Sequence, residues 1–181
     1  MTEEFEFVTN VWRCGPPPAT GQRQRYPSRF WNCFRREYPI GDKKILHMFS
    51  GSMRWGDTTD IRPESGAKIV APYEELPIPD NTYDYVVADP AYNSIFAEEW
   101  KTDLPVPKRI LREGVRVAKP GGIVAILHVI VMAEYKSIPA KMIAIHGILC
   151  GPNNAGRWLN VFRKRGDGGY QRKPKLGDVF G

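Results

Sequence analysis

Three segments of the chain carry apolar residues with little polar interruption, which is the pattern of buried strands. They are "KKILHMF" (43–49), "YDYVVAD" (83–89) and "IVAILHVIV" (123–131). Such runs are typical of strands that are covered on both faces of a parallel sheet. Weaker apolar patterns predict four further strands, at residues 58–62, 67–70, 141–149 and 157–164.

Two segments show the period of an amphipathic helix instead. Residues 28–38, "SRFWNCFRREY", place aromatic side chains four apart, and Ser28 is a suitable cap for this helix. Residues 107–118, "PKRILREGVRVA", begin with a proline, which suits the first turn of a helix. The sequence "KPGG" (119–122) then predicts a turn.

Strands that alternate with helices and end in a strand pair predict an α/β fold, with a mostly parallel sheet and a late antiparallel pair. One domain is expected over residues 41–166. Residues 1–40 contain three consecutive prolines and predict an irregular, basic segment that packs on this core. Residues 167–181 predict a flexible basic tail.

Composition narrows the class of protein. The 181 residues carry a formal net charge of +6, which permits a polyanionic partner. Three cysteines without a CxxC pair argue against a disulfide framework and a structural zinc site, and they favour a reducing cytoplasm. The acidic, polar N-terminus does not resemble a signal peptide, and no apolar run is long enough to span a membrane.

Polar and glycine-containing segments follow four of the predicted strands. They are "FSGSMRWG", "TTDIRP", "APYEELP" and "ADPAYN". Ligands of open parallel sheets bind outside the carboxyl ends of the strands, so these segments together predict a site. Gly51 allows a ligand to approach the backbone closely. Asp60 is placed to accept from two ribose hydroxyls, or is a turn residue. Tyr73 and Leu76 flank an adenine ring, or belong to an ordinary surface loop.

These motifs and their order resemble the class I S-adenosylmethionine-dependent methyltransferases, over roughly residues 20–165. "ILHMFSGS" resembles their first cofactor motif, and "LREGVRVAKPGGIVAILHV" resembles their helix, turn and fifth strand. The tetrapeptide "DPAY" resembles the Asp-Pro-Pro-Tyr signature of enzymes that methylate exocyclic amines of adenine or cytosine in DNA. "TGQRQRYPSRFWNCF" loosely resembles the segment that covers the cofactor in those enzymes. The overall form is that of small phage or bacterial members.

The resemblance implies a Rossmann-like, doubly wound fold and S-adenosyl-L-methionine as cofactor. It implies catalytic roles for Asp89, Pro90, Ala91 and Tyr92. The implied cofactor-binding residues are His47, Phe49, Ser50, Gly51, Ser52, Asp60, Ile61, Tyr73, Leu76 and Asp89.

The chemistry of an exocyclic amine explains this set of residues. The amine is a poor nucleophile because its lone pair is delocalised into the ring. Asp89 and the carbonyl of Pro90 can accept its two hydrogens and direct the lone pair at the methyl group. Stacking on Tyr92 contributes ~1–3 kcal/mol. A base within a duplex must first be flipped out.

Three positions depart from the family's pattern. His47 and Pro72 stand where acidic residues are usual, and Ala91 replaces the second proline of the signature. His47 is either a packed histidine or a neutral side chain that faces the cofactor. These departures bear on cofactor affinity more than on fold.

Basic residues suggest a surface for nucleic acid. The chain has no acidic residue between Val8 and Arg36. Arginines interleave with aromatic residues there, which suits contact with phosphates, although a solvated surface has the same composition. A second basic cluster lies at residues 163–175. The predicted nucleic-acid-binding residues are Arg23, Arg25, Arg29, Arg35, Arg36 and Asn93.

The sequence therefore predicts a methyltransferase that acts on a base amine of nucleic acid, with adenine in DNA favoured and no membrane partner. Methylation of RNA or of a small molecule remains open, since this fold serves many chemistries. A degenerate, non-catalytic binder of nucleic acid or cofactor is the alternative from another class. The sequence leaves open whether the chain is a monomer or a homodimer.

Overall fold

A computed structural model describes residues 6–16, 26–51, 53–99, 102–152 and 154–166 of the chain. The tail at 167–181 lies outside these ranges, so its predicted flexibility stays a prediction. Among the described residues, no helix is both long and apolar enough to cross a membrane.

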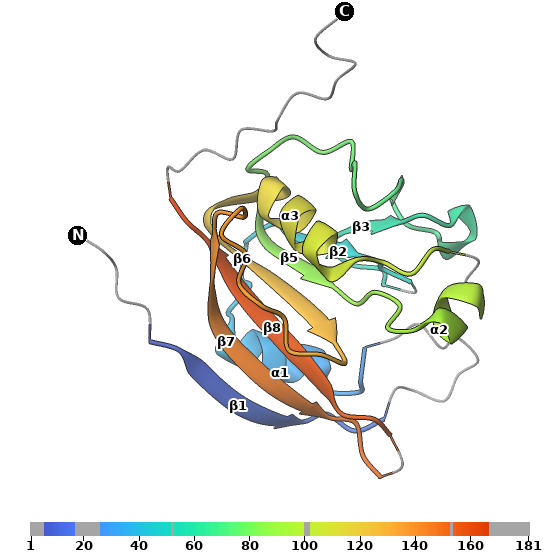
Figure 1. Cartoon of the computed structure of the whole chain (residues 1–181), viewed down its shortest axis with the longest axis vertical. Helices are drawn as coiled ribbons and strands as arrows, with labels where there is room; N and C mark the ends of the chain where they lie inside the picture. Colours follow the sequence, from blue (N-terminus) through green and yellow to red (C-terminus); the bar gives the residue numbers. More distant parts are fainter. Residues whose placement is uncertain (1–5, 17–25, 52, 100–101, 153, 167–181) are drawn as a thin grey trace, which may run out of the picture.

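The described strands form a single sheet in the order β1-β7-β8-β6-β5-β2-β3-β4 (Figure 1). The strands are β1 Val8–Arg13, β2 Ile45–Met48, β3 Asp57–Asp60, β4 Ile69–Val70, β5 Tyr83–Ala88, β6 Ala118–His128, β7 Ala140–Leu149 and β8 Arg157–Lys164. The helices are α1 Phe30–Glu37, α2 Ser94–Glu99 and α3 Pro107–Val117, with a 3-10 turn at Pro63–Ser65.

The sheet is Rossmann-like and mostly parallel, as predicted. Only β8 runs against its neighbours β6 and β7, which confirms the late antiparallel pair. The chain moves outward from β2 to β3 and β4, then returns to place β5 on the other side of β2. Strand order therefore reverses between β2 and β5, and a ligand site is expected at the carboxyl ends of these two strands.

Alternation of side chains along the buried strands gives the sheet two apolar cores. On β5, Val86 and Ala88 belong to the core that packs under α3, whereas Tyr85 and Val87 belong to the core that contains α1. Figure 1 shows α3 and α1 on opposite faces of the sheet. The continuous apolar pattern of residues 83–89 follows directly from burial on both faces.

Helix α1 is held by its aromatic face. Phe30 and Phe34 are fully buried, and burial of such a side chain contributes about 1.5–3 kcal/mol. Ser28 does not cap this helix, contrary to prediction. The capping position is Arg29, which has a left-handed φ of 87° and makes no side-chain cap. The Ser28 hydroxyl instead donates to the carbonyl of Cys14 at 3.0 Å, which joins α1 to the end of β1.

Strand β1 lies in the segment that the sequence predicted to be irregular. It pairs in parallel with the edge of β7, from Val8 opposite Ala144 to Arg13 opposite Leu149. Trp12 is its one buried residue, so the strand shows neither a continuous apolar run nor a regular alternation. The pairing is made by backbone groups at an edge, and the side-chain pattern could not reveal it.

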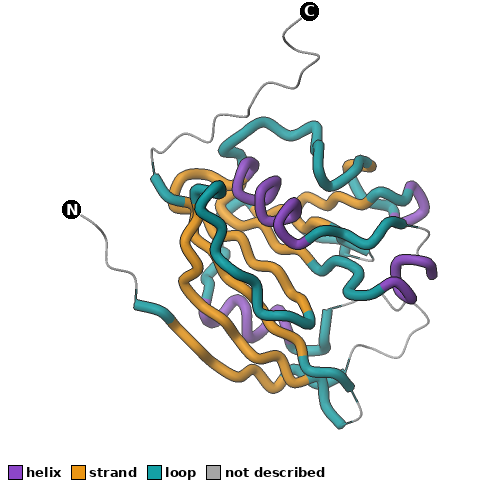
Figure 2. Tube along the Cα trace, in the orientation of Figure 1, coloured by secondary structure: helices purple, strands orange, loops and turns teal. Residues whose placement is uncertain are grey.

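The boundaries of β6 also differ from prediction. The segment "KPGG" is part of β6, and the register shift between Tyr83 and Tyr85 of β5 accommodates it. Gly121 has a φ of 75°, which explains a glycine at this irregularity. At the other end the strand stops at His128, and residues 129–131 are exposed loop. Figure 2 shows that loops also make most of the connections from β2 to β5.

Candidate active site

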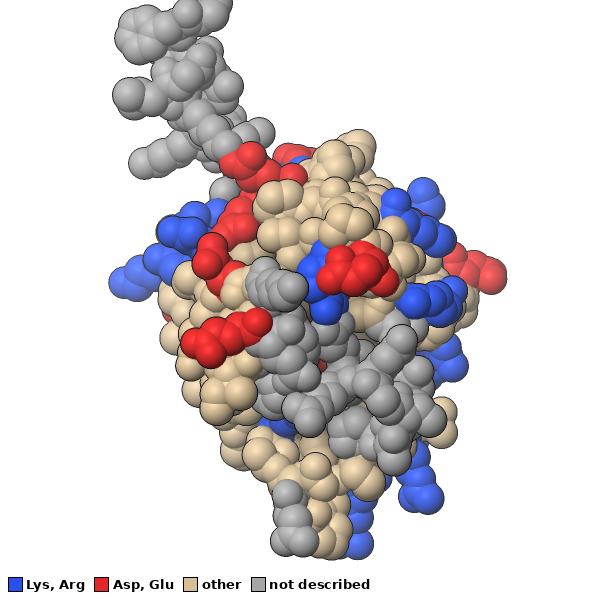
Figure 3. Space-filling view, turned by 90° about the vertical axis from the view of Figure 1, so that its right-hand side faces the viewer, with Lys and Arg blue, Asp and Glu red and all other residues tan. Residues whose placement is uncertain are grey.

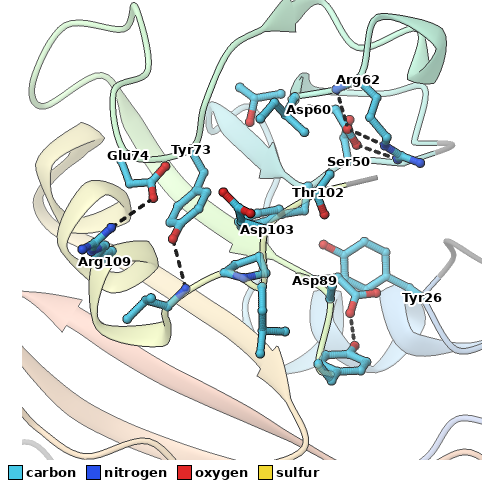
Figure 4. Close-up of a pocket in the computed structure, with 18 of the residues that line it drawn as sticks. Tyr26, Ser50, Asp60, Arg62, Tyr73, Glu74, Asp89, Thr102, Asp103 and Arg109 are labelled. Atoms are coloured by element: carbon cyan, nitrogen blue, oxygen red, sulfur yellow. Dashed lines mark hydrogen bonds and ion pairs between the residues drawn. The ribbon is translucent and has the colours of Figure 1, made fainter. Parts of the chain in front are cut away.

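A cavity of about 200 Å³ opens at the carboxyl ends of β2, β3 and β5, where strand order reverses (Figure 4). Its walls come from the loop after β2, the end of β3, the segment after β4, the segment after β5 and the loop 102–106. Eight of the predicted site residues line it: Phe49, Ser50, Asp60, Ile61, Tyr73, Asp89, Ala91 and Tyr92. Ser52 lies outside the described residues.

Asp60 is held firmly by its own loop. It is 7% exposed, and its carboxylate accepts the amide hydrogens of Gly51 at 3.2 Å and Arg62 at 3.1 Å. The Arg62 guanidinium adds bonds from Nε to Oδ1 at 3.0 Å and from Nη2 to Oδ2 at 3.1 Å. A carboxylate offers about four acceptor positions. A ribose that binds Asp60 must therefore displace the Arg62 side chain.

Gly51 and Leu76 are not in the cavity wall. Gly51 acts through its amide, which helps to orient Asp60. Leu76 is 5% exposed and packs in the core under α3, and its amide donates to Glu113 at 2.9 Å. Leu76 therefore does not face the cavity where an adenine ring was expected. Tyr73 does line it, packs on Phe49 with ring centroids 5.1 Å apart, and accepts the Val106 amide hydrogen at 3.0 Å.

His47 is a packed histidine, one of the two interpretations that the sequence allowed. Its side chain is fully buried and packs edge-on against both Trp31 and Trp55, with ring centroids at 5.0 Å and 4.5 Å. It does not line the cavity. Burial, with a smaller contribution from the Arg35 charge, lowers the pKa of His47 to about 3.

His47 should make the protein less stable in acid. Because its folded pKa lies below the unfolded value, the unfolded chain takes up a proton that the folded chain excludes. Stability is then lost as the pH falls below about 6.5, by about 2 kcal/mol between pH 7 and pH 5. Urea unfolding of wild type and His47→Leu at both pH values checks this. The variant should lose correspondingly less stability on acidification, and an equal loss in both proteins contradicts the assignment.

Asp89 directly follows β5 and projects into the cavity. Its Oδ1 accepts a hydrogen bond from the Tyr92 hydroxyl and lies 3.9 Å from Nη1 of Arg157. Among the described residues, none donates a hydrogen bond to its second oxygen, Oδ2. Burial raises the pKa of Asp89, while the Arg157 charge and the Tyr92 bond act in the opposite direction. The carboxylate is thus anchored through one oxygen and open through the other.

Tyr92 is surrounded by polar and aromatic partners. The Arg157 guanidinium lies over its ring, 4.9 Å from the centroid, and Nη1 donates to its hydroxyl at 3.1 Å. His128, at the end of β6, meets the same ring edge-on with centroids 5.5 Å apart. Tyr92 therefore orients the Asp89 carboxylate. Stacking of a base on Tyr92 stays a prediction. Pro90 does not line the cavity, so the role of its carbonyl also stays a prediction.

Sequence reasoning missed Arg157 and Tyr26, both of which line the cavity. Arg157 is the first residue of β8, the one strand that runs in the opposite direction. An antiparallel strand begins at the edge where its parallel neighbours end, so a basic residue at its start is a usable signal. Tyr26 lies within the segment that resembles a cofactor cover, but the motif itself did not single it out.

The cavity also carries a third ion pair and a free acid. Nη1 of Arg109 on α3 lies 3.6 Å from Oε1 of Glu74. Asp103, in the loop 102–106, is exposed and lines the same space. Asp60, Glu74 and Asp89 are each paired with an arginine, whereas the structure gives Asp103 no such partner among the described residues.

The predicted nucleic-acid-binding residues do not line the cavity. Arg29, Arg35, Arg36 and Asn93 are exposed, and Arg23 and Arg25 lie outside the described residues. Arg35 lies over the Trp55 ring at 4.7 Å, and Nη2 of Arg36 is 4.0 Å from Oε1 of Glu37. Figure 3 shows one face of the molecule, where basic side chains lie at both the left and the right margins and acidic ones lie among them.

Comparison with known proteins finds one family model that matches part of this chain. Residues 58–126 match a family model described as a methyltransferase domain. The match runs from β3 into β6 and includes Asp60 and Asp89. No curated protein sequence matches the chain.

A search of solved structures finds methyltransferases that are similar to parts of this chain. A SAM-dependent methyltransferase from Methanosarcina mazei has 16% identity and a TM-score of 0.49, over 71% of this chain and 98% of its own. TrmN from Thermus thermophilus has 16% identity and a TM-score of 0.49, over 74% of this chain and 47% of its own. The antibiotic-resistance methyltransferase Kmr has 10% identity and a TM-score of 0.48, over 80% of this chain and 98% of its own.

At such identities and TM-scores the structural likeness carries no argument about this chain. The family match identifies residues 58–126, which are less than half of the chain, as similar to a methyltransferase domain. The cofactor of this domain is S-adenosylmethionine.

Proposed function

We propose that this domain methylates an exocyclic base amine of nucleic acid, with adenine in DNA as the favoured substrate. The observation that carries the proposal is the set of hydrogen bonds that the Asp89 carboxylate makes and leaves unmade. Its carboxylate lies in the cavity wall with 14% of the side chain exposed, one oxygen is fixed by Tyr92, and the other has no donor among the described residues. Such an oxygen can accept a hydrogen bond from the N–H of a substrate amine.

The cavity fits the cofactor in two respects. Phe49 and Tyr73 offer an aromatic wall for the adenine ring, and Asp60 offers a carboxylate for the ribose hydroxyls once Arg62 moves aside. When bound, S-adenosylmethionine supplies an electrophilic methyl group on a positively charged sulfur. Three of the four carboxylates that line the cavity are paired with arginines, and the fourth, Asp103, leaves the lining with one more negative than positive charge, which suits this cation.

The residues around Asp89 would prepare the amine. Asp89 accepts one N–H, which directs the nitrogen lone pair away from the carboxylate and increases its nucleophilicity. With the cofactor bound, the nitrogen lone pair would form the bond to the methyl carbon, and the electron pair of the broken carbon–sulfur bond would remain on sulfur. The amine proton leaves to Asp89 or to solvent. Arg157 keeps Asp89 ionised against the effect of burial, because a nearby positive charge favours the carboxylate.

Asp60→Ala should weaken cofactor binding by about 1–3 kcal/mol, the cost of leaving ribose hydroxyls without an acceptor. Calorimetric titration with S-adenosylmethionine measures the effect. Asp57→Ala is the matched control, because Asp57 lies at the opposite end of the same strand, bonds Lys68 and does not line the cavity. Arg62→Met should bind the cofactor at least as tightly as wild type. Unchanged affinity in Asp60→Ala would reject the ribose assignment.

The exposed arginines of α1 and the segment before it would hold the nucleic acid by its phosphates. This role was predicted for Arg29, Arg35 and Arg36, which the structure leaves at the surface. Phosphate contacts make the affinity for nucleic acid fall as the salt concentration rises. The affinities for DNA and RNA can therefore be compared at several salt concentrations.

Transfer of a tritiated methyl group tests the proposed function. Double- and single-stranded DNA, RNA and free nucleosides should be compared at equal amine concentration. Counts in DNA that move to N6-methyladenine after digestion support the proposal. Counts in RNA or nucleosides alone change the substrate, and cofactor binding without transfer to any nucleic acid rejects the proposal.

A further inference from the structure

We propose that the Tyr26 hydroxyl donates a hydrogen bond to the ring nitrogen beside the methylated amine, so that Tyr26 selects aminopurine- or aminopyrimidine-type substrates. The inference rests on the proposed function and adds to it. Asp89 alone would accept any amine, whereas Asp89 and Tyr26 together present an acceptor beside a donor.

Tyr26 is an unsatisfied polar group aimed at the cavity. The residue is 7% exposed, and its hydroxyl has no hydrogen-bond partner among the described residues. Figure 4 shows the hydroxyl directed into the cavity, with the Asp89 carboxylate beside the same ring. Buried hydroxyls are normally bonded, so an open one at a cavity wall indicates a partner that binds there.

The ring that carries this hydroxyl is fixed. It stacks on Phe30 with centroids 4.7 Å apart and 25° between planes, and it meets Trp31 edge-on at 5.0 Å. Pro27 follows immediately and restricts the backbone. Burial, and to a lesser extent the Asp89 charge, raises the pKa of Tyr26 well above its usual value. The hydroxyl is therefore protonated at neutral pH and able to donate.

The chemistry of the two groups defines the substrate edge. Adenine presents an N6 amine beside the N1 acceptor, and cytosine presents an N4 amine beside the N3 acceptor. Asp89 matches the amine and Tyr26 matches the ring nitrogen. An enzyme that flips a base reads it along this edge. An alkyl amine has no neighbouring acceptor and would leave Tyr26 unpaired.

The test pairs a variant with a substrate analogue. Tyr26→Phe and wild type are assayed on one oligonucleotide that carries adenine or 1-deazaadenine at the target, since the analogue keeps the amine and lacks the N1 acceptor. We expect kcat/KM to fall about 10- to 100-fold when either partner is removed. Removing both should cost no more than removing one. Cytosine and 3-deazacytosine form the equivalent pair.

The matched control is Tyr38→Phe. Tyr38 lies just beyond α1, bonds His146 at 2.6 Å and does not line the cavity, so kcat/KM should stay near wild type. Multiplicative losses from the variant and the analogue, or an unchanged kcat/KM in Tyr26→Phe, overturn the inference and leave the proposed function standing. So does an equal loss of S-adenosylmethionine affinity, which would assign the hydroxyl to the cofactor. If wild type methylates no nucleic acid, both proposals fall.

Discussion

Asp89→Ala should abolish methyl transfer and leave cofactor affinity and the melting temperature near those of wild type. In the proposed function the carboxylate would act on the substrate through Oδ2, which has no protein donor among the described residues. Its loss leaves Arg157 without an opposite charge, but it also removes a buried carboxylate whose pKa is raised by desolvation. These two effects on stability oppose each other. Tritiated methyl transfer, calorimetric titration and thermal unfolding of the same preparation separate them.

Asp89→Asn is the sharper variant. The amide keeps one acceptor but places a donor beside the amine, so most of the activity should again be lost. Asp84→Asn is the control, because Asp84 lies at the opposite end of β5 and bonds Lys119. Full activity in Asp89→Ala would place the chemistry elsewhere in the cavity and leave "DPAY" as a strand-ending turn.

The raised pKa of Asp89 also predicts a pH dependence. A protonated carboxyl cannot accept the amine hydrogen in the same way, so the rate should fall on acidification at a higher pH than for an ordinary aspartate. Arg157→Gln removes the positive charge that opposes protonation, and it should move this fall to still higher pH.

Glu113→Ala should lower the free energy of unfolding by about 3–5 kcal/mol, the usual cost of breaking a buried ion pair by removing one partner. Glu113 is 6% exposed and accepts the amide hydrogen of Leu76. It also bonds the Arg116 guanidinium at 2.6 Å, and that guanidinium donates to the carbonyls of Leu76 and Ile78. One α3 carboxylate therefore holds the loop that carries Tyr73.

Urea unfolding measures the change, with Glu98→Ala as the control because Glu98 is an exposed acid on α2. Cofactor affinity should fall in Glu113→Ala even where the protein remains folded, since the 72–78 loop loses its anchor. A loss below 1 kcal/mol would mean that the Asp80 carboxylate, 2.6 Å from Nη1 of Arg116, compensates for the missing charge.

The sequence predicted the part of the fold that side-chain burial specifies. Strands β2, β5 and β6 are buried on both faces, and the apolar runs in their sequences predicted them. Strand β1 could not be predicted in the same way, because it is an edge strand with one buried residue, Trp12. The short helix α2 was also missed. It covers only six residues, too few for a 3.6-residue period to stand out.

The residues of the candidate site likewise fall into those that the sequence predicted and those that it did not. Asp60, Tyr73 and Asp89 follow strand ends, so topology alone brought them to one cavity. Leu76 and His47 were assigned to the site by their positions in the family's motifs. In the structure both side chains pack in the apolar interior instead. Arg157 and Tyr26 line the cavity although both are distant in sequence from the segments that form most of its wall. The predicted antiparallel direction of β8 could have pointed to Arg157, whereas the place of Tyr26 depends on its packing against α1, which no local pattern encodes.

The pairing of β1 with β7 has a consequence for how the protein is made. The first strand finds its partner only at residues 144–149, so it must wait for nearly the whole domain to be synthesised. At about 5–20 residues per second, the delay is roughly 7 to 30 s. During that time Trp12 has no β7 to pack against, and the surrounding core, with Ile148 and Leu159, cannot close. Nascent chains that stall before β7 would expose this apolar surface to chaperones and to one another.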